Sequence, residues 1–275
     1  MKETKIKLNN KIEIFVYNFL EEGILLKNKK KFIESVTSKL KYNEIGFAGW
    51  KDKRGFIEHL KCWLFSDVDK NKNYPDKFLS SERVNELIKK TLIKCSAVLN
   101  REKLYIYIFP TLSKFVIEKM GRVGGISIWK KVIYIDIFPV KDVEKHIQFS
   151  IAHELAHAIS PFYHENLSIG NGIVFDGIAE HFRNNFLGGK KSLWSNALSK
   201  EKAKKIFNEI KPRLEEKNYN FYKEVFYGTG KYPLWSGYAM GYHILGDYLK
   251  KLKKTDWKKI INTNPGKILK ESGWL

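Results

Sequence analysis

Cysteine, arginine and long apolar runs are all scarce in this sequence of 275 residues. Two cysteines, Cys62 and Cys95, cannot build a disulfide framework, and neither has a CxxC or CxxH spacing, so a reducing compartment is expected. No run approaches roughly 18 consecutive apolar residues, which excludes a membrane-spanning helix, and the first 20 residues make a poor signal peptide. The sequence therefore predicts a cytoplasmic protein.

The scarcity of arginine bears on the net charge of +20, which would ordinarily suggest a polyanionic partner. Only six of the 50 basic residues are arginines, and the lysines are spread along the whole chain. Nucleic-acid surfaces favour arginine for its planar, bidentate donor fork. We interpret the charge mainly as a lysine-rich composition and expect no nucleic-acid partner. A non-catalytic, lysine-rich polyanion binder with a structural metal site is kept as an alternative.

With 43% apolar residues, the chain is expected to fold around a real core, and the order of its patterns is helices, then strands, then helices. That order predicts an α+β fold rather than alternating β-α units. Residues 5–26 fit either a hairpin turning at Asn9-Asn10 or a helix over residues 14–20, and residues 67–76 read as a linker. The remaining expectations are helices at 29–40, 56–65, 80–99, 142–159, 172–187, 199–217 and 236–252, a strand at 104–109, and a hairpin at 126–138.

The chemistry is carried by residues 153–157, whose sequence HELAH is an HExxH motif on a predicted helix. Residues four apart on a helix lie one turn above each other, so His153 and His157 can reach one metal ion while Glu154 lies beside them. Apolar residues repeating every four positions from Val143 to Ile159 define a separate face of the same helix. This pattern predicts a zinc site.

A hydrolytic zinc ion requires a third protein ligand. The next predicted helix offers Asp176 and Glu180, with eighteen and twenty-two residues intervening after His157. His164 is one residue too far for the HExxHxxGxxH pattern, and Ser160 stands where that pattern needs glycine. Asp176 is the preferred ligand, with Glu180 as the partner of a ligating histidine, and the reverse assignment stays open.

The arrangement resembles the gluzincins, since the run Asp176-Gly-Ile-Ala matches the N-E-G-x-A run of zinc aminopeptidases with Asp in place of Glu. Residues 80–275 resemble the YjaZ-like predicted zinc-dependent proteases still more closely. The shared features are Gly124-Gly125 before a β-segment, HELAH, the run DGIAEHF, and the segment WSGYAMGY that begins at Trp235. The resemblance implies a zincin-like fold in a catalytic domain over residues 76–275, with residues 1–75 left as an N-terminal lobe of unassigned role.

In this interpretation Glu154 takes a proton from the attacking water, and Tyr238 donates a hydrogen bond to the developing oxyanion, with Tyr242 and His243 as alternatives. Residues 132–137 occupy the position of a zincin edge strand, which can pair with an extended peptide substrate. Gly124 and Gly125 either let substrate approach or form a plain tight turn. Hydrolysis of a non-peptide amide and a regulatory pseudo-protease remain as alternative functions.

Overall fold

The computed structural model describes residues 1–8, 12–75, 79–99, 103–165 and 167–275. It consists of two compact units, Met1–Glu154 and Leu155–Leu275. The boundary between them lies within a single helix, α5 (Glu144–Ile159), which carries the HExxH motif. No helix in the described ranges combines the length and the low charge needed to cross a bilayer.

A mixed five-stranded sheet organises the first unit, with the strands in the order β1, β2, β3, β5, β4. The central strands β2, β3 and β5 are parallel to one another, and β1 and β4 pair antiparallel at the two edges. The unit is therefore α+β, as the sequence predicts, and its sheet is mixed. The strands are β1 (Lys2–Leu8), β2 (Ile12–Asn18), β3 (Lys103–Pro110), β4 (Val123–Ile126) and β5 (Val132–Ile137).

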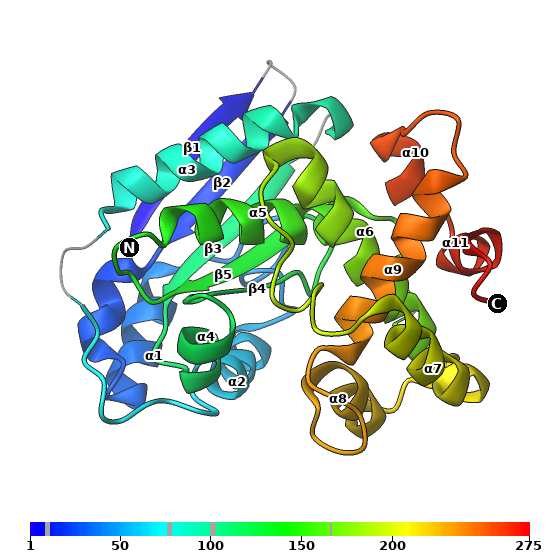
Figure 1. Ribbon diagram of the computed structural model, residues 1–275. Coiled ribbons are helices and arrows are strands. Elements are labelled where there is room, and N and C mark those ends of the chain that lie inside the picture. The colour runs from blue at the N-terminus through cyan, green and yellow to red at the C-terminus, as the bar shows by residue number, and fades with distance from the viewer. Residues whose placement is uncertain (9–11, 76–78, 100–102, 166) are drawn as a thin grey trace. The chain divides into compact units, whose positions relative to one another are not determined.

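Helices cover both faces of this sheet, with α3 and the first part of α5 on one face and α1, α2 and α4 on the other (Figure 1). Side chains alternate between the faces of each strand, so Ile106 and Ile135 point one way, while Tyr107 and Tyr134 point into the core beneath α1 and α2. The helical elements are η1 (Leu20–Leu25), α1 (Lys29–Lys39), α2 (Lys53–Leu64), α3 (Ser81–Lys94), η2 (Ser96–Val98) and α4 (Lys114–Lys119).

Several expectations for the first unit are confirmed. The N-terminal segment is a hairpin of β1 and β2 rather than a helix, although its expected turn at Asn9-Asn10 lies outside the described residues, as does residue 76 of the expected linker. The side chain of Ser80 accepts a hydrogen bond from the backbone N–H of Arg83 and caps α3. Because β1 and β2 belong to the same sheet as β3, residues 1–75 share their core with later residues, and their assignment to a separate N-terminal lobe stays a prediction.

The prediction that residues 132–137 form an edge strand is wrong. Strand β5 lies between β3 and β4, and the edge strand on this side is β4. Gly124 and Gly125 are part of β4 itself, which pairs with β5 through Gly124↔Asp136 and Gly125↔Ile135. The sequence pattern identifies the hairpin but contains no information on which of its two strands pairs with β3.

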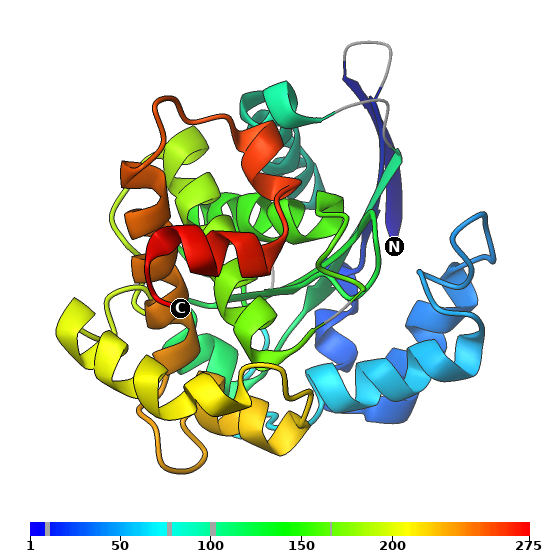
Figure 2. The ribbon, with the colours of Figure 1, turned by 90° about the vertical axis from the view of Figure 1, so that its right-hand side faces the viewer.

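The second unit is helical, and helices α6 and α9 cross at its centre. A Cβ atom added to Gly177 of α6 would lie 2.2 Å from the carbonyl oxygen of Gly241 in α9, so the two backbones touch. Figure 2 shows α11 in red beside α9. The helical elements are α6 (Ile169–Leu187), α7 (Lys200–Ile210), η3 (Lys211–Arg213), α8 (Tyr219–Tyr227), α9 (Ser236–Lys250), α10 (Trp257–Ile261) and α11 (Pro265–Ser272).

Candidate metal centre

Helix α5 carries the HExxH motif on its buried portion. Ile147, Ile151 and Leu155 recur every four residues and are fully buried, so they form the apolar face that anchors the helix. His153 and His157 lie one turn apart on a different face, because α5 is a continuous α-helix through both residues. Their side chains are also largely withdrawn from solvent, with 8% and 4% of the residue surface exposed. Two imidazoles are thus held side by side in a protected environment.

Asp176 of α6 joins these two histidines. One ligand atom from each of His153, His157 and Asp176 lies within 4.8 Å of the other two, and all three residues are buried. Nε2 of His157 is 3.6 Å from Oδ1 of Asp176. Two ligand atoms of a tetrahedral zinc ion, each about 2.1 Å from the metal, lie about 3.4 Å apart, so the observed separation fits one shared ion.

The donor set also fits zinc chemically. Two imidazole nitrogens and one carboxylate oxygen are ligands that zinc accepts, and three protein ligands leave a fourth position open. An open position distinguishes hydrolytic zinc sites from structural ones, which are closed by four protein ligands. Among the described residues, no other group of three histidine, cysteine or carboxylate side chains has this proximity. The three residues can therefore hold one metal ion in a site of the catalytic type, with one coordination position left open.

Glu154, between the two histidines in sequence, lies against the edge strand of the sheet. A Cβ atom added to Gly125 of β4 would be 2.8 Å from Cγ and 3.0 Å from Oε1 of Glu154. Any larger residue at position 125 would collide with this carboxylate. Gly125 is therefore needed for close approach of β4 to Glu154 rather than for a tight turn, since it lies within the strand.

Glu180 lies one turn beyond Asp176 on α6 but outside the group of three ligand atoms. It is completely buried, and its Oε2 accepts hydrogen bonds from the hydroxyls of Ser192 and Ser195 at 2.7 and 2.8 Å. Nη2 of Arg183 is 3.3 Å from the same oxygen. These contacts satisfy a buried carboxylate, so the geometry favours Asp176 over Glu180 as the third ligand.

Tyr238 of α9 is the candidate donor whose pKa is raised by the charge of Asp176. Its ring packs edge to face against Trp235 with centroids 5.3 Å apart. Burial raises the pKa of the Tyr238 phenol well above its usual value, and the neighbouring Tyr227 and the charge of Asp176 raise it further. The phenol therefore keeps its proton at neutral pH, and it is hydrogen-bonded with the side chain of Tyr227.

The two alternative donors on α9, Tyr242 and His243, contact residues other than the three candidate ligands. The ring of Tyr242 stacks on His181 with centroids 4.3 Å apart, and the Lys191 ammonium lies 4.5 Å from the centre of the same ring. Nε2 of His243 is 3.1 Å from the backbone oxygen of Leu198. Asp176 is among the charges that raise the pKa of Tyr238, and it is not among those that raise the pKa of Tyr242.

Tyr163 belongs to this site and was missed by the sequence analysis. It lies in the segment after α5, and its ring stacks on the His157 imidazole with centroids 4.2 Å apart. The Tyr163 ring also contacts Phe175, with the ring centroids 5.2 Å apart and the two rings nearly perpendicular. Tyr163 thus packs face to face against the imidazole of one of the three candidate ligands. An aromatic residue six positions after the second histidine of HExxH was the available signal.

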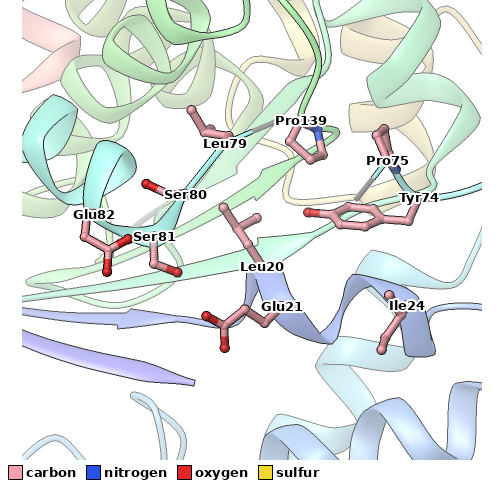
Figure 3. Close-up of a pocket in the computed structure, with 10 residues that line it drawn as sticks. All are labelled: Leu20, Glu21, Ile24, Tyr74, Pro75, Leu79, Ser80, Ser81, Glu82 and Pro139. Atoms are coloured by element: carbon pink, nitrogen blue, oxygen red, sulfur yellow. The ribbon is translucent and has the colours of Figure 1, made fainter. Parts of the chain in front are cut away.

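The first unit also contains a pocket of about 380 Å³ near the carboxyl ends of β2 and β5 (Figure 3). Its rim carries two carboxylates, of which Glu82 is paired with Lys2. None of its lining residues is a histidine, so it does not offer the donor set found on α5 and α6. The pocket is lined by Leu20, Glu21, Ile24, Tyr74, Pro75, Leu79, Ser80, Ser81, Glu82 and Pro139.

Comparison with known proteins gives one family. Residues 84–270 match the model of DUF2268, a family described as predicted Zn-dependent protease. The matched range begins within α3 and runs through both histidines, Glu154 and Asp176 to the last helix. No curated protein and no solved structure matches the chain.

Proposed function

The chain belongs to the DUF2268 family of predicted zinc-dependent proteases, and from this premise we propose that it hydrolyses peptide bonds at a zinc ion held by His153, His157 and Asp176. The observation that carries the proposal is the buried proximity of these three ligand atoms, two of which belong to histidines on the same helix as Glu154. When bound, zinc acts as a Lewis acid that polarises a carbonyl group and lowers the pKa of a coordinated water toward about 7.

Glu154 is the general base of the proposed reaction. Its carboxylate accepts a proton from the attacking water and afterwards delivers that proton to the departing amine. Because Gly125 has no side chain, the backbone of β4 comes close to this carboxylate, and a peptide lying along β4 would pass beside it. The proposal thereby links the proton-transferring group to the strand that would align the substrate.

Tyr238 is the proposed donor to the oxyanion that forms on the scissile carbonyl. The raised pKa of its phenol keeps the donor proton in place throughout the neutral range. A donor already oriented by packing against Trp235 needs little reorganisation as charge develops. Loss of such a donor typically lowers kcat by about 10²–10³, which gives Tyr238→Phe a measurable effect.

The proposal is tested by Glu154→Gln, which removes the base and leaves the three proposed ligands intact. We expect about one zinc per chain in both wild type and variant, and a fall in peptide hydrolysis of about 10²–10⁴ in the variant. Glu215→Gln, which neutralises an exposed carboxylate of the second unit, is the matched control and should keep full activity. Retained turnover in Glu154→Gln, or full activity in metal-free protein, would contradict the proposal.

A further inference from the structure

Four aromatic side chains form a continuous row on the first unit. The aromatic row consists of Trp129, Trp50, His59 and Trp63, and each ring touches the next. The centroid of Trp129 is 5.3 Å from that of Trp50, which is 5.2 Å from His59, which in turn is 5.4 Å from Trp63. These residues come from the β4–β5 turn, from the segment before α2 and from α2 itself, so the fold gathers them from distant parts of the sequence.

The aromatic row is attached to the end of edge strand β4. His59 and Trp63 both contact the ring of Tyr134, at 5.4 and 5.7 Å, and Tyr134 is the register partner of Ile126 in β4. A Cβ atom added to Gly49 would lie 2.8 Å from the Trp129 ring. The row therefore lies on the same face of the sheet as Ile126 and begins at the turn that follows β4.

The side chains of the row carry no charge, and Trp129 is the most exposed of them. Trp129 is 39% exposed, and Trp50, His59, Trp63, and Ile126 are only partly buried. Burial lowers the pKa of His59 to about 4, so its imidazole is neutral at physiological pH. Trp50, Trp63 and Ile126 also pack against the core of the first unit, so the apolar surface that the row leaves to solvent is centred on Trp129.

Strand β4 connects this surface with Glu154. In the described part of the chain β4 pairs with β5 alone, so the backbone groups along its outer edge pair with no further strand. Successive side chains of a strand point to opposite faces, and accordingly Gly125 faces Glu154 while Ile126 faces the aromatic row. Trp129 follows Gly125 by four residues and lies in the turn between β4 and β5, so the extended-chain rise of about 3.3 Å per residue sets an upper limit of about 13 Å on their separation.

From this placement we infer that the aromatic row, with Ile126 and Ile128, binds a bulky apolar side chain of an extended peptide substrate paired with β4, three to four residues from the scissile bond. The inference rests on the proposed peptidase function, because the scissile bond is located by Glu154. Backbone pairing along β4 gives affinity for any sequence, and the aromatic row adds selectivity for one position. The substrate class is thus peptides with an aromatic or large aliphatic residue at that distance from the cleaved bond.

The test compares peptides that carry a single Phe among small residues, with Phe moved from two to five residues from the cleaved bond on either side. Wild type should prefer one such position, three or four residues away, by about 10–200-fold in kcat/KM over the Ala peptide. Trp129→Ala should remove most of this preference through KM. Trp129→Phe should restore the preference, and Tyr219→Ala, at a residue 69% exposed in the second unit, should not affect it.

The outcomes separate this inference from the proposed function. No cleavage of any peptide by zinc-loaded wild type would remove the function itself. Cleavage without preference for Phe at these positions, or with the preference intact in Trp129→Ala, would overturn the aromatic row as a binding site while the function stands. A change of oligomeric state in Trp129→Ala, measured by sedimentation, with unaltered peptide selectivity would also overturn it in favour of contact with a second copy of the chain.

Discussion

Replacing Asp136 by asparagine should stabilise the protein at mildly alkaline pH and have little effect at acid pH. Asp136 lies on β5, is 1% exposed, and its Oδ1 has no hydrogen-bond partner among the described residues. Burial raises the pKa of this carboxyl to about 7, and the negative charge of Asp67 also raises it, while a hydrogen bond with Thr111 opposes the shift. The folded protein therefore favours the neutral acid.

The sign of the effect follows from proton binding in the two states. The unfolded chain releases the Asp136 proton near pH 3.8, whereas the folded chain holds it up to about pH 7. Between these values the folded state binds more protons, so the free energy of unfolding falls as pH rises. A difference of about three pKa units at 1.36 kcal/mol each corresponds to about 4 kcal/mol across the whole window, and to about 3 kcal/mol between pH 4.5 and 8.

Asparagine stays neutral at every pH and its amide oxygen can still accept a hydrogen bond from Thr111. Urea unfolding of both proteins near pH 4.5 and near pH 8 measures the effect, and the difference between the proteins should change by about 3 kcal/mol in favour of Asp136→Asn at the higher pH. Glu118→Gln, at an exposed carboxylate of α4, should change stability by less than about 0.5 kcal/mol. Parallel pH dependences in wild type and Asp136→Asn would show that this carboxyl is not held neutral.

Two further predictions concern the second unit. Gly241→Ala should destabilise the second unit by about 2–5 kcal/mol in urea unfolding, because the added Cβ would lie 2.0 Å from the carbonyl oxygen of Ile173. Gly246→Ala on the same helix is the control: its added Cβ would have its nearest neighbour at 3.6 Å, so this variant should be neutral or stabilising. Tyr163→Ala should weaken zinc binding by about 10–100-fold in a competition titration, because it removes the ring that stacks on the His157 imidazole. Tyr163→Phe keeps this ring and should keep wild-type affinity. Equal losses of affinity in both variants would show that the hydroxyl matters and not the stacking.

The elements predicted best from the sequence are those whose signal is local. The motif HELAH is recognisable from the spacing of its two histidines. The apolar repeat every four residues through Ile147, Ile151 and Leu155 predicts that the motif lies on a helix, and this helix is α5. The expected helix at 172–187 is α6, which begins three residues earlier because Ser168 caps it by accepting from the N–H of Asn171. The expected helix at 199–217 ends at Ile210, where Pro212 shortens it into the 3-10 turn η3.

Other features depend on contacts between distant residues, and no local pattern contains them. The parallel pairing of β3 with β5 puts β4 at the edge, and this is decided by pairing such as Tyr107 with Tyr134 rather than by either strand's own alternation. The short helices α4, α8, α10 and α11 were also missed, because each has too few turns to display a clear period. Their start signals were nonetheless present, including the Asn264 cap before Pro265.

The shorter side chain of Asp176, compared with the Glu of the resembled families, is no reason in itself to regard the site as inactive. A carboxylate that loses one methylene can still reach the metal if its backbone lies closer to the histidine, and Oδ1 of Asp176 does lie 3.6 Å from Nε2 of His157. The position of α6 in the second unit is fixed independently of any metal, since Gly177 touches Gly241 and a Cβ at Gly170 would lie 3.2 Å from Cβ of Leu214. Glycines on α6 thus allow close packing on both sides of position 176, and this packing holds the helix that places Asp176 beside His157.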